Sequence, residues 1–363
     1  MAQILNPINK AEEDSMKKRQ EEKALTDWDY IKQGNACFPG KEYRKAIELY
    51  DEAIRVNPNN AIAYGNRALA HLYLNEYNEA IEDNNIAVSL DPKYAGAFRN
   101  RGNAYAELGQ HQQALKDYSK AIELDPNDTI AYFNRGNNYV KLGQHAQAIQ
   151  DYDKATELNP SDAAAYFNRG NSYADLKQYE QAIQDYNKVI ALKPNDTDPY
   201  INRGIIYAKL GQHKQAIKDH CKAIMLNPND ADAYNTRGNS YVRLGQHPQA
   251  IQDYDKAIAL NPNDASAYNN RAFSYAHIKE FDKAISDVEK AHSLEPNIPT
   301  YIHTYGFIYL QQENWEKAIA YFTKALSYDD KLKEAYEDRA RAYRAIGEIE
   351  KAEADEAQAR ELD

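Results

Sequence analysis

The chain has 363 residues, of which 43% are hydrophobic and 27% charged, and its mean hydropathy is −0.83. This balance is typical of a folded chain in water, and no stretch approaches the ~18 consecutive apolar residues of a membrane span, which argues against membrane insertion. Acidic residues outnumber basic ones by 55 to 44, and the resulting formal charge of −11 repels phosphate backbones, so nucleic acid is a poor candidate partner.

The first element in chain order is the segment of residues 1–26, which lies outside the pattern that fills the rest of the chain. It contains the mixed-charge run EEDSMKKRQEEK and is interpreted as a lead-in helix or a frayed tail. Residues 1–10 lack the basic and then apolar sequence of a secretory signal. Because Cys37 and Cys221 are the only cysteines and no disulfide is expected, the sequence predicts a cytoplasmic protein.

Prolines at a constant spacing show that the remainder of the chain is a repeat array. They follow one another at steps of 34 residues, at Pro58, Pro92, Pro126, Pro160, Pro194, Pro228, Pro262 and Pro296. Within each repeat, apolar or small residues recur at helical spacing in two blocks. The sequence therefore predicts an array of helical hairpins.

The residues that bound the two blocks predict where the helices of each hairpin begin and end. An aspartate such as Asp128 precedes the first block and is suited to cap it. The first block ends at a Leu-Gly pair such as Leu108-Gly109, where glycine can adopt the left-handed conformation that closes a helix. The second block ends before a proline such as Pro126, because proline disfavours helical geometry in the residue before it.

The repeat resembles the tetratricopeptide repeat, in which an aromatic residue, Gly, Tyr, Ala, a second aromatic residue and Pro recur over 34 residues. Residues 95–128 carry these positions as Phe98, Gly102, Tyr105, Ala114, Tyr118 and Pro126. The resemblance implies an all-α fold, a right-handed α–α superhelix or solenoid of about ten hairpins, and a scaffold that binds other proteins. Nine repeats are predicted in residues 27–332, and a degenerate tenth in residues 333–363 has the charged surface of a terminal cap.

One column departs from the family pattern, because arginine replaces leucine at Arg67, Arg101, Arg135, Arg169, Arg203, Arg237, Arg271 and Arg339. Aspartate follows sixteen residues after each, at Asp83, Asp117, Asp151, Asp185, Asp219, Asp253, Asp287 and Asp355. A half-buried arginine needs a partner, and the hairpin brings these two heights together. Two repeats without the arginine also lack the aspartate, with Gln33 and Leu49 in one and Tyr305 and Tyr321 in the other. We therefore predict structural pairs within each hairpin, and not an anion-binding stripe.

Asparagine, a mediocre helix former, recurs in the first helices at Asn66, Asn100, Asn134, Asn168, Asn202 and Asn270. Three residues later, on the same face of the helix, stand Asn103, Asn137, Asn171 and Asn239. A row of amides can bond the main chain of an extended peptide with little demand on its sequence. This ladder is similar to that of the tetratricopeptide arm of O-GlcNAc transferase, which implies peptide binding. The alternative is that the amides bond neighbouring helices or loops.

An apolar patch precedes the asparagines in the middle repeats, at Phe133, Phe167 and Ile201. If these side chains face the groove, they would anchor apolar side chains of the partner, in the way that binding hot spots do. The alternative interpretation is that they pack between repeats.

The sequence contains no motif for catalysis, and we predict a protein that is not an enzyme and uses no cofactor or metal. The expected partner is a protein or peptide. Arg99, Asn103 and Asn134 resemble part of the carboxylate clamp of chaperone-docking members of the family, but the next repeat has Ala164 and Asn168 where basic residues are required. Docking of a C-terminal carboxylate and self-association as a structural scaffold are the alternatives.

Overall fold

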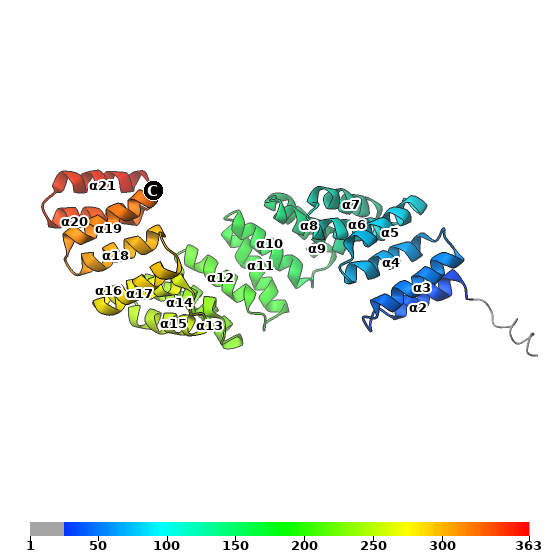
Figure 1. The fold of residues 1–363 in the computed structure, drawn as a ribbon, viewed down its shortest axis with the longest axis horizontal. Helices are drawn as coiled ribbons and strands as arrows, with labels where there is room; N and C mark the ends of the chain where they lie inside the picture. The colour runs from blue at the N-terminus through cyan, green and yellow to red at the C-terminus, as the bar shows by residue number, and fades with distance from the viewer. Residues whose placement is uncertain (1–24, 363) are drawn as a thin grey trace, which may run out of the picture. The chain divides into compact units, whose positions relative to one another are not determined.

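The computed structural model describes residues 25–362, which form helices α2 to α21 without a strand (Figure 1). The predicted N-terminal segment, residues 1–26, lies outside the described residues as far as residue 24. The helices gather into two compact units, unit 1 (Met1–Leu176) and unit 2 (Lys177–Asp363). Each unit is described by itself.

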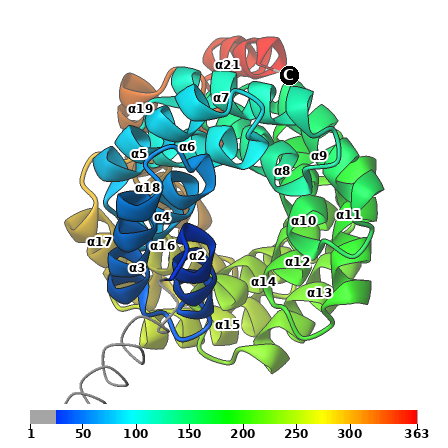
Figure 2. The same ribbon diagram turned by 90° about the vertical axis from the view of Figure 1, so that its right-hand side faces the viewer.

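Unit 1 consists of four hairpins and one further helix. Its first helices are α2 (Asp27–Ala36), α4 (Ala61–Tyr73), α6 (Ala95–Glu107), α8 (Thr129–Lys141) and α10 (Ala163–Asp175). Its second helices are α3 (Tyr43–Val56), α5 (Tyr77–Leu90), α7 (His111–Leu124) and α9 (His145–Leu158). Figure 2 shows α4, α6, α8 and α10 on the inner side of a curve, with α5, α7 and α9 on its outer side.

Unit 2 begins with α11 (Tyr179–Leu192) and continues as five hairpins. Their first helices are α12 (Asp198–Lys209), α14 (Ala231–Arg243), α16 (Ala265–His277), α18 (Pro299–Gln311) and α20 (Lys333–Ala345). Their second helices are α13 (His213–Leu226), α15 (His247–Leu260), α17 (Phe281–Leu294), α19 (Trp315–Tyr328) and α21 (Ile349–Glu361).

The helix ends follow the signals in the sequence. The side chain of Asp128 accepts a hydrogen bond from the backbone N–H of Ala131 and caps α8. Gly109, after the end of α6, has φ +72°, and α7 ends at Leu124, ahead of Pro126. In a repeat without this glycine, Asn75 adopts the same left-handed conformation, with φ +60°. The predicted ends of these helices are confirmed.

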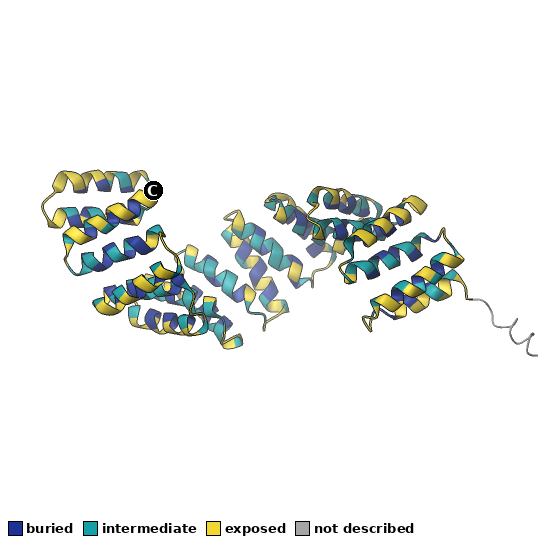
Figure 3. Cartoon of the chain, in the orientation of Figure 1, coloured by how far each residue is buried: buried dark blue, intermediate teal, exposed yellow. Residues whose placement is uncertain are grey.

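Small residues allow the two helices of a hairpin to pack closely. A Cβ atom on Gly136 of α8 would lie 2.7 Å from Cε1 of Tyr152 in α9, so glycine makes room for the tyrosine ring. Ala114 and Ala148, in the predicted alanine column, are completely buried. Figure 3 shows buried residues recurring along the helices between exposed ones, as amphipathic helices require. The predicted all-α hairpin array is confirmed.

Candidate functional site

The repeated arginines join the two helices of their hairpins. In α8, Nε of Arg135 donates to Oδ2 of Asp151 at 2.8 Å, and Nη2 donates to Oδ1 at 2.6 Å. Equivalent forks confirm the predicted pairing for Arg67–Asp83, Arg101–Asp117, Arg203–Asp219, Arg237–Asp253, Arg271–Asp287 and Arg339–Asp355. In the repeat without the arginine, Tyr305 and Tyr321 stack at 5.1 Å between ring centroids.

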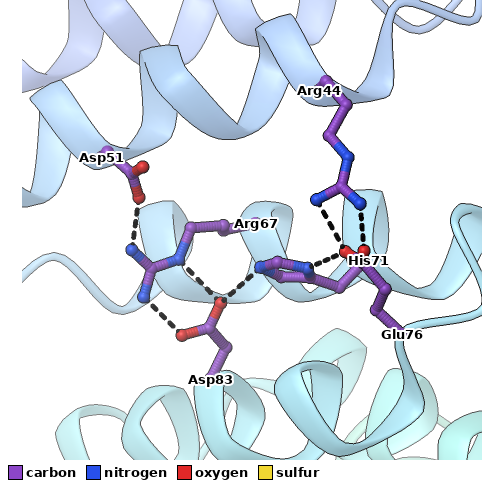
Figure 4. A network of polar contacts seen from close by, with 6 residues as sticks. All are labelled: Arg44, Asp51, Arg67, His71, Glu76 and Asp83. Atoms are coloured by element: carbon purple, nitrogen blue, oxygen red, sulfur yellow. Dashed lines mark hydrogen bonds and ion pairs between the residues drawn. The ribbon is translucent and has the colours of Figure 1, made fainter.

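The third guanidinium nitrogen of these arginines reaches the preceding hairpin. Nη1 of Arg135, for example, donates to Oγ of Ser119 at 3.1 Å. Figure 4 shows the arrangement at Arg67, which bonds Asp83 in α5 and Asp51 in α3. Since these donors are occupied by the protein itself, the arginines have a structural role.

The asparagines of successive first helices are bonded to one another. Nδ2 of Asn134 in α8 donates to Oδ1 of Asn103 in α6 at 2.9 Å. The hydroxyl of Tyr118 in α7 donates to the same oxygen at 2.8 Å. The arrangement recurs when Asn168 and Tyr152 donate to Asn137, and also in the groups Asn66–Asn35–Tyr50 and Asn270–Asn239–Tyr254. The ladder therefore links neighbouring helices, as the alternative interpretation of the sequence states.

The tyrosines of these groups were not found by the sequence analysis. Burial raises the pKa of Tyr118 and of Tyr152, so both hydroxyls remain protonated donors. The signal was available, because each tyrosine follows its asparagine by fifteen residues and the two positions change together. Where the asparagine is replaced by Leu69, Ile205 or Phe273, the tyrosine is replaced by Asn84, His220 or Val288.

The linked amides retain part of their hydrogen-bonding capacity. Among the residues that the structure describes, Nδ2 of Asn103 and Oδ1 of Asn134 have no hydrogen-bond partner in the protein. Asn137 and Asn168 present the same two groups one repeat later. Each linked pair therefore keeps one amide donor and one carbonyl acceptor for a further molecule.

These groups line a cavity of about 940 Å³ in unit 1. Its amide lining consists of Asn103, Asn134, Asn137, Asn138, Asn168 and Asn171. The side chains of Leu69, Leu72 and Tyr73 from α4 form one end of the lining. Charged residues that end the first helices, Glu107 and Lys141, also contribute to it. We call this cavity the unit 1 groove.

Other predicted site residues lie elsewhere. Asn66 bonds Asn35, and the side chain of Asn100 belongs to a residue that is only 5% exposed. Asn202, Asn239 and Asn270 belong to unit 2, where the last two bond each other at 3.0 Å.

The predicted apolar patch is not part of the described lining of the unit 1 groove. The ring of Phe133 packs on Tyr152, with 6.0 Å between ring centroids. Ile201 packs against a buried cluster that contains Tyr200 and Ala223. Phe167 is half-buried in α10. A role for these three residues as anchors stays a prediction.

The predicted fragment of a carboxylate clamp is engaged by the protein itself. Nη1 of Arg99 in α6 lies 2.7 Å from Oδ2 of Asp128, the residue that caps α8. The guanidinium of Arg99 therefore helps to hold two successive first helices together.

Two searches of the described chain bear on metals and membranes. In residues 25–362, no three His, Cys, Asp or Glu side chains are grouped so that they could hold a metal ion. None of the helices in that range combines the length and the apolarity that crossing a bilayer requires.

Comparisons with known proteins identify the repeat. A sequence model of the TPR repeat matches residues 34–74, 69–109, 102–143, 206–245 and 238–278. Further models of the tetratricopeptide repeat match residues 133–197, 185–218, 265–298 and 299–332. The matched ranges run without a gap from residue 34 to residue 332.

Curated relatives are similar over short stretches. Serine/threonine-protein phosphatase 5 from Homo sapiens is 55% identical over 40 residues, which are 11% of this chain and 8% of the phosphatase. Small glutamine-rich tetratricopeptide repeat-containing protein 2 from Saccharomyces cerevisiae is 45% identical over 64 residues, 18% of this chain and 17% of that protein. The chain thus spans less than a fifth of the length of these relatives.

A solved structure supports the fold alone. The C-terminal part of a TPR repeat-containing protein from Cytophaga hutchinsonii matches with a TM-score of 0.57 and 22% identity. The match covers 66% of this chain and 98% of the other.

Proposed function

Because the chain belongs to the tetratricopeptide repeat family, whose arrays are protein-interaction scaffolds, we propose that it binds an extended segment of a partner protein in the unit 1 groove. The observation that carries this proposal is the row of incompletely bonded amides in the groove lining. The similarity to the ladder of O-GlcNAc transferase belongs to the same proposal.

The amides match the chemistry of an extended main chain. A peptide in this conformation offers N–H and C=O groups at regular intervals. Oδ1 of Asn134 can accept from such an N–H group, and Nδ2 of Asn103 can donate to a C=O group. Tyr118 and Asn134 both hold the oxygen of Asn103, so its amide is oriented before the partner arrives, which lowers the entropic cost of binding.

The test is the double substitution Asn134→Ala and Asn168→Ala in the full chain. These two side chains can be removed while Tyr118 and Tyr152 keep their bonds to Asn103 and Asn137. Alanine is also the better helix former, so we expect an unchanged helix content and melting transition. Partners captured by the parent, identified by affinity pull-down and mass spectrometry, should bind at least about tenfold more weakly to the variant.

The control replaces polar side chains outside the groove, with Asn78→Ala in α5 and Gln113→Ala in α7, both exposed. It should bind as the parent does. Equal binding by the parent and the groove variant would place the binding surface elsewhere, and early unfolding of the groove variant would show that its amides serve stability.

The two alternative functions predict different results in the same assays. Docking of a C-terminal carboxylate would be lost when the partner peptide is amidated, and the pairing of Arg99 with Asp128 argues against it. Self-association would appear as a concentration-dependent mass in light scattering. A cytoplasmic location stays a prediction.

A further inference from the structure

We propose that the unit 1 groove selects a segment of another protein in which an apolar side chain, of leucine or an aromatic residue, precedes a basic residue along the groove from α4 towards α6. This inference rests on the proposed function, because it names the side chains that the groove recognises while the amides hold the main chain.

The apolar contact is provided by α4. In this helix, Leu69 occupies the repeat position at which α6 carries Asn103, so an apolar side chain interrupts the ladder at this end of the groove. Beside it, Leu72 is half-buried and Tyr73 is 57% exposed. An exposed apolar patch of this kind within a polar groove suits an apolar side chain of a partner.

The exposed ring of Tyr73 is held in place by the first hairpin. It stacks on Tyr43 at 4.8 Å between centroids with 5° between the ring planes, and its edge contacts Phe38 at 5.8 Å. A ring fixed by such contacts loses little freedom when a partner binds. The apolar wall is therefore preorganised although water reaches it.

Charge complementarity decides the neighbouring side chain. Glu107 of α6 occupies the same repeat position as Tyr73, 34 residues later, and both line the groove. Lys141 of α8 follows at the next repeat. Neither Glu107 nor Lys141 has an ion-pair partner among the described residues. An unpaired carboxylate next to the apolar wall favours a cation in the partner and disfavours an anion.

The test uses a library of random dodecapeptides displayed on phage, selected on the immobilised full chain. The expected result is enrichment of a leucine or aromatic residue followed within a few positions by Lys or Arg. A fluorescein-labelled peptide of the enriched class then measures affinity by anisotropy.

Two variants separate the two contacts. Glu107→Lys should weaken the enriched peptide about fivefold or more and shift the selected charge from basic to acidic. Its control, Glu82→Lys, makes the same charge change at an exposed site on α5 outside the groove. Tyr73→Ser should weaken the same peptide about tenfold through the lost apolar contact, whereas Met225→Ser, at an exposed site in unit 2, should not.

The outcomes distinguish this inference from the proposed function. Peptides that lose affinity in the Asn134→Ala, Asn168→Ala chain but show no apolar or charge preference would overturn the inference and leave the function standing. Equal effects of Glu107→Lys and Glu82→Lys would overturn the charge selection, because the global field would explain both. Enriched peptides that bind the asparagine variant as well as the parent would overturn the proposed function itself.

Discussion

A single residue that departs from its column changes the chemistry around it. Most second helices place a tyrosine against the glycine of the preceding helix, but α13 places His220 there, completely buried beside Gly204. The repeat also has Ile205 where others have the asparagine that accepts the tyrosine hydroxyl bond. Burial lowers the pKa of His220 to about 4. The histidine therefore stays neutral in the folded chain under mildly acidic conditions.

This depressed pKa predicts that the chain loses stability in acid. Above the ordinary value of ~6.5, His220 is neutral in both the folded and the unfolded chain. Below it the unfolded chain binds a proton that the folded chain does not, so this residue alone should lower the free energy of unfolding by about 2 kcal/mol at pH 5. His220→Phe, which has the apolar ring of Phe322 in α19, should reduce the difference between urea unfolding at pH 7 and at pH 5. The same pH difference in parent and variant would contradict this explanation.

At the scale of the element, the arginines join helices both within and between hairpins. The side chain of Asp151 is 5% exposed and that of Arg135 is 19% exposed, so each ion depends on the other for compensation of lost hydration. The stacked rings of Tyr305 and Tyr321 show that the same place between two helices accepts an uncharged pair.

The pair in the α8–α9 hairpin should therefore be strongly coupled. Arg135→Ala and Asp151→Ala should each destabilise the chain by about 2–4 kcal/mol, because each leaves an uncompensated ion. The double substitution should cost at least ~1 kcal/mol less than the sum in denaturant unfolding. Lys154→Ala, which breaks an exposed pair with Glu157 in the same hairpin, should cost less than ~0.5 kcal/mol. Additive losses for Arg135 and Asp151 would refute the coupling.

At the scale of the whole molecule, stability is distributed along the array. Within unit 2, α18 contacts α16, α17, α19 and α20, whereas the terminal helix α21 contacts α20. The buried residues of α21 are Ala352, Asp355 and Ala359, which offer little apolar surface. In a repeat array, stability is approximately a sum of repeat and nearest-neighbour terms.

Hydrogen exchange should follow this distribution. We expect the amides of α21 to exchange earlier than those of α18 when mass spectrometry follows deuterium uptake of the native chain, because an end helix opens without disturbing two neighbours. Correction for intrinsic exchange rates is the control. Equal protection of α18 and α21 would mean that unit 2 opens only as a whole.

Much of the fold follows from the sequence, because the determining interactions are local or periodic. Gly109 and Pro126 mark helix ends through their own backbone preferences. The pairing of Arg135 with Asp151 was also predictable, since a hairpin of fixed length brings positions sixteen residues apart to one height. The two repeats that lack both partners provided the check within the sequence itself.

The tertiary structure decided which atoms of the ladder remain available. Oδ1 of Asn103 is occupied by Tyr118 and Asn134, which approach it only when α7 and α8 pack beside α6. Packing also assigned the apolar end of the groove to α4, with Tyr73 held by Tyr43, whereas Phe133 packs on Tyr152. Periodicity places residues on the same face of a helix, but the rotamers and the contacts with neighbouring helices determine which side chains and which atoms reach the groove.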